Sequence, residues 1–80
     1  MLASADGMID LAAVVRAVKA EYADEATVTW SRNGDEARAH IYIDFTEGEQ
    51  HMLGLQLDEP RLSAKQLAAN IIEAIDAERR

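Results

Sequence analysis

One segment restricts the fold more than any other, because small or apolar side chains alternate with polar ones along residues 36–46. The positions of one parity are Ala37, Ala39, Ile41, Ile43 and Phe45, and those of the other are Arg38, His40, Tyr42 and Asp44. A period of two is typical of a β-strand that buries one face. The chain must therefore form a sheet with one covered side, and an antiparallel sheet can leave its other side in water.

A neighbouring strand is predicted over residues 27–32, where Val28 and Trp30 alternate with polar residues. The dipeptide Asn33-Gly34 follows, and it favours a two-residue hairpin turn because both residues tolerate positive φ. That turn predicts the pairs Arg32 with Asp35, Trp30 with Ala37 and Val28 with Ala39. Because Trp30 shares a face with Val28, we expect it to be buried in the core or at an interface.

A third strand is predicted over residues 50–58, with Leu53, Leu55 and Leu57 on one face. A two-residue loop at Glu47-Gly48 would turn these leucines outward. A three-residue loop from Thr46 to Gly48 keeps them on the covered face and gives the glycine the left-handed bulge position. This loop predicts the pairs Ile41 with Leu53 and Ala39 with Leu55.

Amphipathic helices flank the three strands. The first is predicted from Met8 to about Ala23, capped by Asp6 or Ser4, with an apolar stripe of Leu11, Val14, Val15, Val18 and Tyr22. The second follows a capping box of Ser63 and Gln66 and runs to about Glu78, with an apolar stripe of Leu67, Ala68, Ile71, Ile72, Ala74 and Ile75. We therefore predict one α+β domain over residues 1–80: a helix, a three-stranded antiparallel meander and a helix, with both helices on one sheet face and residues 1–6 disordered.

An 80-residue chain without cysteine has few ways to reinforce a small core, because neither a disulfide nor a thiolate metal site is available. Association with another chain is the remaining stabiliser, so we expect a protein partner. The first helix has an apolar stripe that one small sheet is not expected to cover, and the polar sheet face is either solvated or a partner surface. The predicted interface residues are Met8, Leu11, Ala12, Val15, Trp30, Tyr42 and Met52.

The net charge of −7, from 15 acidic and 8 basic side chains, disfavours nucleic acid and anionic membranes as partners. If DNA is bound, the candidate contacts are Arg32, Arg38, Arg61, Lys65, Arg79 and Arg80. No apolar run approaches the roughly 18 residues of a membrane span, and residues 1–7 lack a basic signal-peptide start, so we expect a cytoplasmic protein.

No arrangement of residues predicts catalysis. His40 and His51 have opposite parity on neighbouring strands, so we expect two solvated imidazoles that point apart, with no third metal ligand beside them. The glycines are isolated and form no phosphate-binding loop. We therefore expect no enzyme activity, metal, cofactor or small-molecule substrate.

The order helix, three strands, helix also occurs in the double-stranded-RNA-binding domain, whose second helix opens with a basic cluster. Here that position reads Ser63-Ala64-Lys65-Gln66, with one lysine, and the match is rejected. Residues 37–80 instead resemble the YbaB/EbfC family of small bacterial nucleoid-associated proteins. The resemblance rests on the run Leu55-Gln56-Leu57-Asp58-Glu59-Pro60 and on an alanine-rich helix that ends in Ala77-Glu78-Arg79-Arg80. Glu59 departs from the usual Asp-Pro pair of the family, and the first helix lacks the family's Gln-, Met- and Lys-rich stretch.

The resemblance implies a tight homodimer, with duplex binding as a role of the family. Actinobacterial relatives include accessory proteins associated with type VII secretion loci, which look like protein-binding modules. An acidic, alanine-rich chain is similar to that branch. The first hypothesis is therefore a non-enzymatic homodimeric interaction or accessory module, and the alternative is a nucleoid-associated DNA-binding protein.

Overall fold

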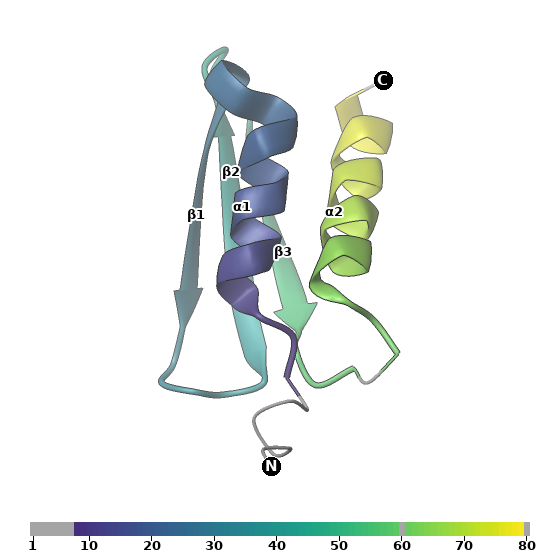
Figure 1. Ribbon diagram of the computed structural model, residues 1–80. Helices are drawn as coiled ribbons and strands as arrows, with labels where there is room; N and C mark the ends of the chain where they lie inside the picture. Colours follow the sequence, from purple (N-terminus) through teal and green to yellow (C-terminus); the bar gives the residue numbers. More distant parts are fainter. Residues whose placement is uncertain (1–7, 60, 80) are drawn as a thin grey trace.

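The computed structural model describes residues 8–59 and 61–79 and confirms the predicted α+β order (Figure 1). The elements are α1 (Leu11–Tyr22), the 3-10 turn η2 (Ala23–Glu25), β1 (Ala26–Arg32), β2 (Arg38–Phe45), β3 (Gln50–Gln56) and α2 (Ala64–Arg79). The strands form an antiparallel sheet in the order β1-β2-β3. The predicted disorder of residues 1–6 and the predicted caps Ser4 and Asp6 lie outside the described residues.

The core lies between one face of the sheet and the two helices. The buried strand residues lie on one face of the sheet: Val28, Ala39, Ile41, Ile43, Phe45 and Leu55. They form one cluster with the buried helix residues Leu11, Val14, Val15, Val18, Tyr22, Leu67, Ala68, Ile71 and Ile75. Figure 1 shows α1 and α2 side by side in front of the sheet, so the opposite sheet face carries neither helix.

The first helix starts later than predicted. Asp10 is its N-cap, and the Asp10 carboxylate accepts a hydrogen bond of 3.1 Å from the backbone N–H of Ala12. The backbone N–H of Ile9 donates to the carbonyl oxygen of Leu57 over 2.7 Å. Because this bond holds Ile9 beside the end of the sheet, Met8 and Ile9 do not continue the helix.

The predicted pairing of the first hairpin is wrong by four residues. Arg32 pairs with Ala39, Trp30 with Ile41 and Val28 with Ile43, and residues 33–37 form the loop. The shift is even, so every side chain keeps its predicted face. Gly34 does adopt a positive φ of 57°, but within this wider loop.

Burial and hydrogen bonds explain the wider loop. The observed register places Val28 beside Ile43, which is fully buried, whereas the predicted register would have placed it beside the smaller Ala39. Inside the loop, the Arg32 side chain donates to the carbonyl oxygen of Glu36 over 2.7 Å. The N–H of Leu57 donates to the carbonyl oxygen of Ala37 over 2.7 Å, which extends the β2–β3 ladder and keeps Ala37 out of a tight turn.

The second hairpin is confirmed. Ile41 pairs with Leu53, and Ala39 pairs with Leu55. Phe45 donates to the carbonyl oxygen of Glu49 over 2.8 Å, which closes the loop over residues 46–48. Gly48 has a φ of 104°, a conformation that side chains rarely adopt, so glycine is required at this position.

The start of α2 also agrees with the prediction. The Ser63 hydroxyl accepts a hydrogen bond of 3.1 Å from the backbone N–H of Gln66. The Gln66 side chain donates to Asn70 instead of returning to the cap. Ala74, which was expected on the apolar stripe, is exposed.

None of the described helices combines the length and the apolar character that a membrane crossing requires.

Candidate functional site

The candidate site is the sheet face opposite the helices, which we call the open face. Its side chains form cross-strand rows, because the register aligns the polar positions of the three strands. From the 46–48 loop toward the 33–37 loop, the rows are Thr27–Asp44–Gln50, Thr29–Tyr42–Met52, Ser31–His40–Gly54 and finally Arg38–Gln56. The open face thus carries a polar perimeter around a row with an aromatic and a methionine.

Tyr42 and Met52 differ in how they present apolar surface. The Tyr42 hydroxyl lies 3.0 Å from the Ser31 hydroxyl, so the ring is tethered toward β1 and is half-buried. Met52 is 64% exposed and is the most exposed large hydrophobic residue of the described chain. Thr29, Tyr42, Asp44, Gln50 and Met52 line a shallow hollow around this row. This part of the open face therefore offers apolar contact area with hydrogen-bonding groups at its border.

The open side of β2 has opposite charges at its two ends. Arg38 is exposed at one end, where Ser31, Asn33 and His40 help to line a second hollow. Asp44 is half-buried at the other end. Among the described residues, neither Arg38 nor Asp44 takes part in a salt bridge within the chain. Both charges are therefore available to a partner.

The predicted interface residues are divided among three places. Leu11 and Val15 are 6% and 8% exposed, so they are core residues and not a partner surface, which corrects the expectation for the first helix. Phe45 of β2 contacts Tyr22 of the first helix, and residues of the second helix join the same core, so the apolar stripe is covered from two sides. Ala12 is exposed on the outer side of α1, and Met8 is half-buried, with its sulfur 3.9 Å from Arg32 Nη2.

Trp30 is 51% exposed, so its expected burial in the core is wrong, and its burial at an interface stays a prediction. Its pairing with Ile41 places it on the helix side of the sheet. However, β1 is an edge strand, and within the described part of the chain no further strand pairs with its outer flank. Trp30 therefore lies on the other side of the sheet from Tyr42 and Met52.

The predicted DNA contacts are also dispersed. Arg61 and Lys65 are exposed around the start of α2, whereas Arg79 lies at its end, about 20 Å from Lys65 at ~1.5 Å per residue. Arg38 belongs to the open face, and Arg32 bonds the 33–37 loop. Arg80 is outside the described residues.

Arg79 is engaged within the domain. Its guanidinium lies 3.9 Å from the ring centroid of Phe45 and forms ion pairs with Glu47 at 3.0 Å and Glu49 at 3.4 Å. The loop at 46–48 thereby tethers the end of α2. A phosphate would have to compete with these contacts, so Arg79 is poorly placed to bind DNA.

His51 belongs to the same cluster and is not solvated as expected, since its side chain is 11% exposed. Its Nε2 atom lies 2.5 Å from a Glu49 oxygen, and its Nδ1 atom lies 3.8 Å from Glu78. The hydrogen bond from His51, with the nearby charge of Arg79, holds the pKa of Glu49 below its usual value.

Tyr22 joins this cluster from the helix side. Its ring meets that of Phe45 edge-on at 5.1 Å, and its hydroxyl donates to Asp76 over 3.1 Å. Burial raises the pKa of Tyr22 to about 12, and the hydrogen bond to the Asp76 carboxylate acts in the same direction. The cluster is a structural anchor between α1, α2 and the second hairpin.

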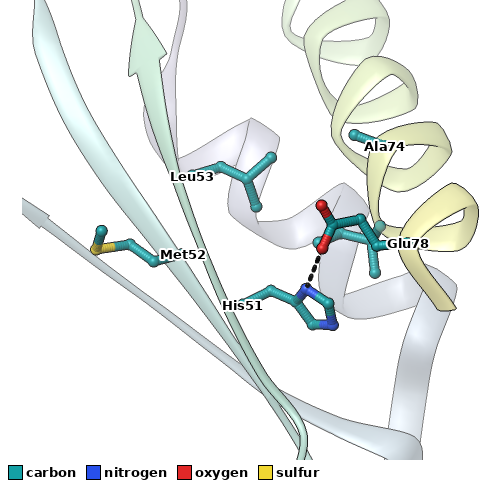
Figure 2. A pocket seen from close by; sticks show the side chains of 6 residues that line it. His51, Met52, Leu53, Ala74 and Glu78 are labelled. Atoms are coloured by element: carbon teal, nitrogen blue, oxygen red, sulfur yellow. Dashed lines mark ion pairs between the residues drawn. The ribbon is translucent and has the colours of Figure 1, made fainter.

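A small groove separates β3 from α2, and Figure 2 shows it from close by. Its volume is about 90 Å³, and it is lined by His51, Met52, Leu53, Ala74, Ile75 and Glu78. Figure 2 shows Met52 on the far side of β3 from His51 and Leu53, so the apolar end of Met52 belongs to the open face. His40 lies on the open face as well, and the two histidines point apart as predicted.

Within residues 8–59 and 61–79, no three His, Cys, Asp or Glu side chains are grouped so that they could hold a metal ion. Comparison of the chain with protein-family models, curated proteins and solved structures gives no match. The resemblance to the YbaB/EbfC family therefore stays a prediction, and function has to be argued from the open face.

Proposed function

We propose that the chain is a non-enzymatic, cytoplasmic, homodimeric protein-interaction module and that the open face is its contact surface. The observation that carries the proposal is the exposed Met52, 64% accessible beside Tyr42 on a sheet face that carries neither helix. Methionine and tyrosine are enriched at protein interfaces. Burying a methionine side chain fully contributes about 1.5 to 3 kcal/mol.

The size of the domain supports association. An 80-residue chain without cysteine has only one small core, here packed on one side of a three-stranded sheet. A second copy that binds the folded state and not the unfolded state would raise the free energy of unfolding by mass action. The accessory role implied by the resemblance to type VII secretion proteins is consistent with such a module.

DNA binding is the alternative, and the positions of the basic residues favour it less. Duplex binding needs several cations that reach neighbouring phosphates together. Arg61 and Lys65 lie around one end of α2, Arg38 lies on the sheet, and Arg79 is paired with Glu47 and Glu49. The net charge of −7 adds a general repulsion of DNA.

Light scattering after size exclusion, from about 2 to 200 µM protein, tests the proposal in the concentration range of weak and moderate dimers. We expect the wild type to approach the mass of a dimer and Met52→Glu to shift toward the monomer. Ala69→Glu is the matched control, because Ala69 is exposed on α2 and the change adds the same charge. A wild type that stays monomeric throughout overturns the proposal.

A labelled duplex tests the alternative by fluorescence anisotropy. We expect no binding at about 50 mM or 200 mM salt, the range over which phosphate contacts lose affinity steeply. Binding at the lower salt that weakens at the higher salt, and that Lys65→Glu abolishes, would instead support the nucleoid-associated role.

A further inference from the structure

The open side of β2 is complementary to its own reversal. Along the strand it reads Arg38, His40, Tyr42 and Asp44. If a second β2 lies over it in the opposite direction, with the centre near position 41, each arginine faces an aspartate. Two-fold symmetric interfaces require this kind of self-complementarity, because the same surface is used by both subunits.

The flanking strand β3 is also complementary to its own reversal, through the shapes of its side chains. The reversal places the row that contains Tyr42 over the row that contains His40, so Met52 meets Gly54. Met52 is 64% exposed and projects from the face, whereas Gly54 has no side chain. A projection and a recess therefore face each other twice in such a dimer.

Gly54 is not explained by the folding of one chain. It has an ordinary strand conformation, and an added Cβ would meet only ring atoms of His40, at 4.0 Å. A methyl group would thus fit in the monomer, and glycine within a strand lowers stability relative to alanine. A partner side chain that occupies the recess accounts for the glycine.

We propose that two copies pack through their open faces with their β2 strands antiparallel, about a two-fold axis that runs across the strands. This geometry rests on the proposed homodimer and names its contacts. Arg38 pairs with Asp44 of the partner subunit, Tyr42 packs on His40 of the partner subunit, and Met52 fills the recess at Gly54 of the partner subunit. Sheets that pack face to face lie about 10 Å apart, a distance that these side chains span together.

Charge selects this orientation. A two-fold axis along the strands would instead place Arg38 against Arg38 and Asp44 against Asp44, with repulsion at both ends. An acidic or a basic partner protein would match one end of β2 and oppose the other. A second copy in the antiparallel orientation matches both.

The dimer is small by the standard of stable complexes. Seven residues on three strands cover about 23 Å by 14 Å, or roughly 300 Å², against about 800 Å² of buried surface per partner in standard interfaces. We therefore expect a dissociation constant in the micromolar range. In so small an interface, two charge pairs determine a large share of the affinity.

Charge exchange tests the geometry by sedimentation equilibrium at about 50 mM salt, where exposed charges are least screened. Arg38→Asp and Asp44→Arg should each raise the dissociation constant of the homodimer at least about tenfold. The double variant, with both changes in one chain, should return to within about threefold of the wild type. An equimolar mixture of the two single variants should form heterodimers.

Arg61→Asp is the control, since it makes the same charge change outside the open face. Gly54→Val tests the recess independently, because valine favours strands and its Cβ has room beside His40 in the monomer. Its thermal midpoint should equal or exceed that of the wild type while its dissociation constant rises.

A wild-type dimer that Arg38→Asp and Gly54→Val leave unchanged would overturn this geometry while the homodimer itself stands. A wild type that is monomeric at all concentrations would overturn both. Weakening by Arg38→Asp without recovery in the double variant would show that Arg38 contacts some other group, and would also overturn the proposed orientation.

Discussion

The guanidinium of Arg79 lies 3.9 Å from the centre of the Phe45 ring, so the last turn of α2 is fastened to the second hairpin. Glu47 and Glu49 hold the same side chain from the loop side. A residue that the sequence offers as a DNA contact is thus part of the scaffold. Among the other predicted DNA contacts that the structure describes, Arg38 lies on the open face, whereas Arg61 and Lys65 lie around the start of α2. These residues form no shared basic patch, so we argue function from the open face.

Arg79→Ala should destabilise the fold, because the variant loses the contact with Phe45 and two ion pairs. We expect the thermal midpoint to fall by about 4 °C, the shift that corresponds to a cation–π contact in a small domain. Circular dichroism melts measure the change. Arg61→Ala is the control and should change the midpoint by less than about 2 °C, as is usual for a surface substitution.

We expect the free energy of unfolding to fall in alkali because of the Tyr22 phenol. Its pKa is raised from 10.0 to about 12 in the folded state, mainly by burial. Between these values the unfolded chain releases the proton and the folded chain keeps it, so the free energy of unfolding falls as the pH rises. The total loss is about 3 kcal/mol, because each pKa unit corresponds to ~1.4 kcal/mol.

The difference between wild type and Tyr22→Phe isolates this effect from other alkaline titrations. Phenylalanine keeps the contact with Phe45 and removes the titrating group. Urea unfolding between about pH 9 and pH 12 should show a flatter decline for the variant. Equal slopes for the two proteins would contradict the raised pKa of Tyr22.

We expect the opposite pH dependence in acid, where stability should fall with pH because of the Glu49 carboxylate. Its pKa is lowered in the folded state, mainly by the hydrogen bond from His51. The stabilisation is therefore complete above the unfolded pKa of about 4.5 and is lost as the pH falls through the lowered value. Glu49→Gln should lower the thermal midpoint at pH 7, and the difference from the wild type should shrink as the pH falls below 4.5. Glu73→Gln should have a small effect at both ends of this range.

Trp30 is the single tryptophan and reports directly on the corrected first hairpin. With 51% of the residue exposed, its fluorescence should be red-shifted and readily quenched by acrylamide in the native protein. A blue-shifted emission protected from acrylamide would contradict the described position of β1. Because Trp30 lies on the helix side, dimerisation through the open face should leave its emission unchanged.

Much of the fold was predictable because its signals are local and consistent. The alternation along β2, the glycine at position 48 and the Ser63 cap each fix an element with residues that are near in sequence. The first hairpin was not, because Asn33-Gly34 favours a tight turn and the pairing of Val28 with Ile43 favours a wide one. Burial outweighed turn preference.

The same distinction applies to the site. Parity alone places Tyr42 and Met52 on the polar sheet face, so the membership of the open face was predictable. The complementarity of the open face with a second copy depends on which residues lie in the same cross-strand row. Those rows follow from the pairing register in the folded structure. The engagement of Arg79 could not be predicted, because Glu47 and Glu49 lie 32 and 30 residues away.

The most direct test of the open-face dimer is the methyl resonance of Met52 in protein labelled at its methionine methyl groups. Spectra recorded from about 5 to 500 µM span the affinity expected of a small interface. The Met52 signal should shift with concentration along a binding isotherm, while the signal of Met8, on the helix side near Arg32, stays in place. A Met52 signal that is independent of concentration would contradict the account.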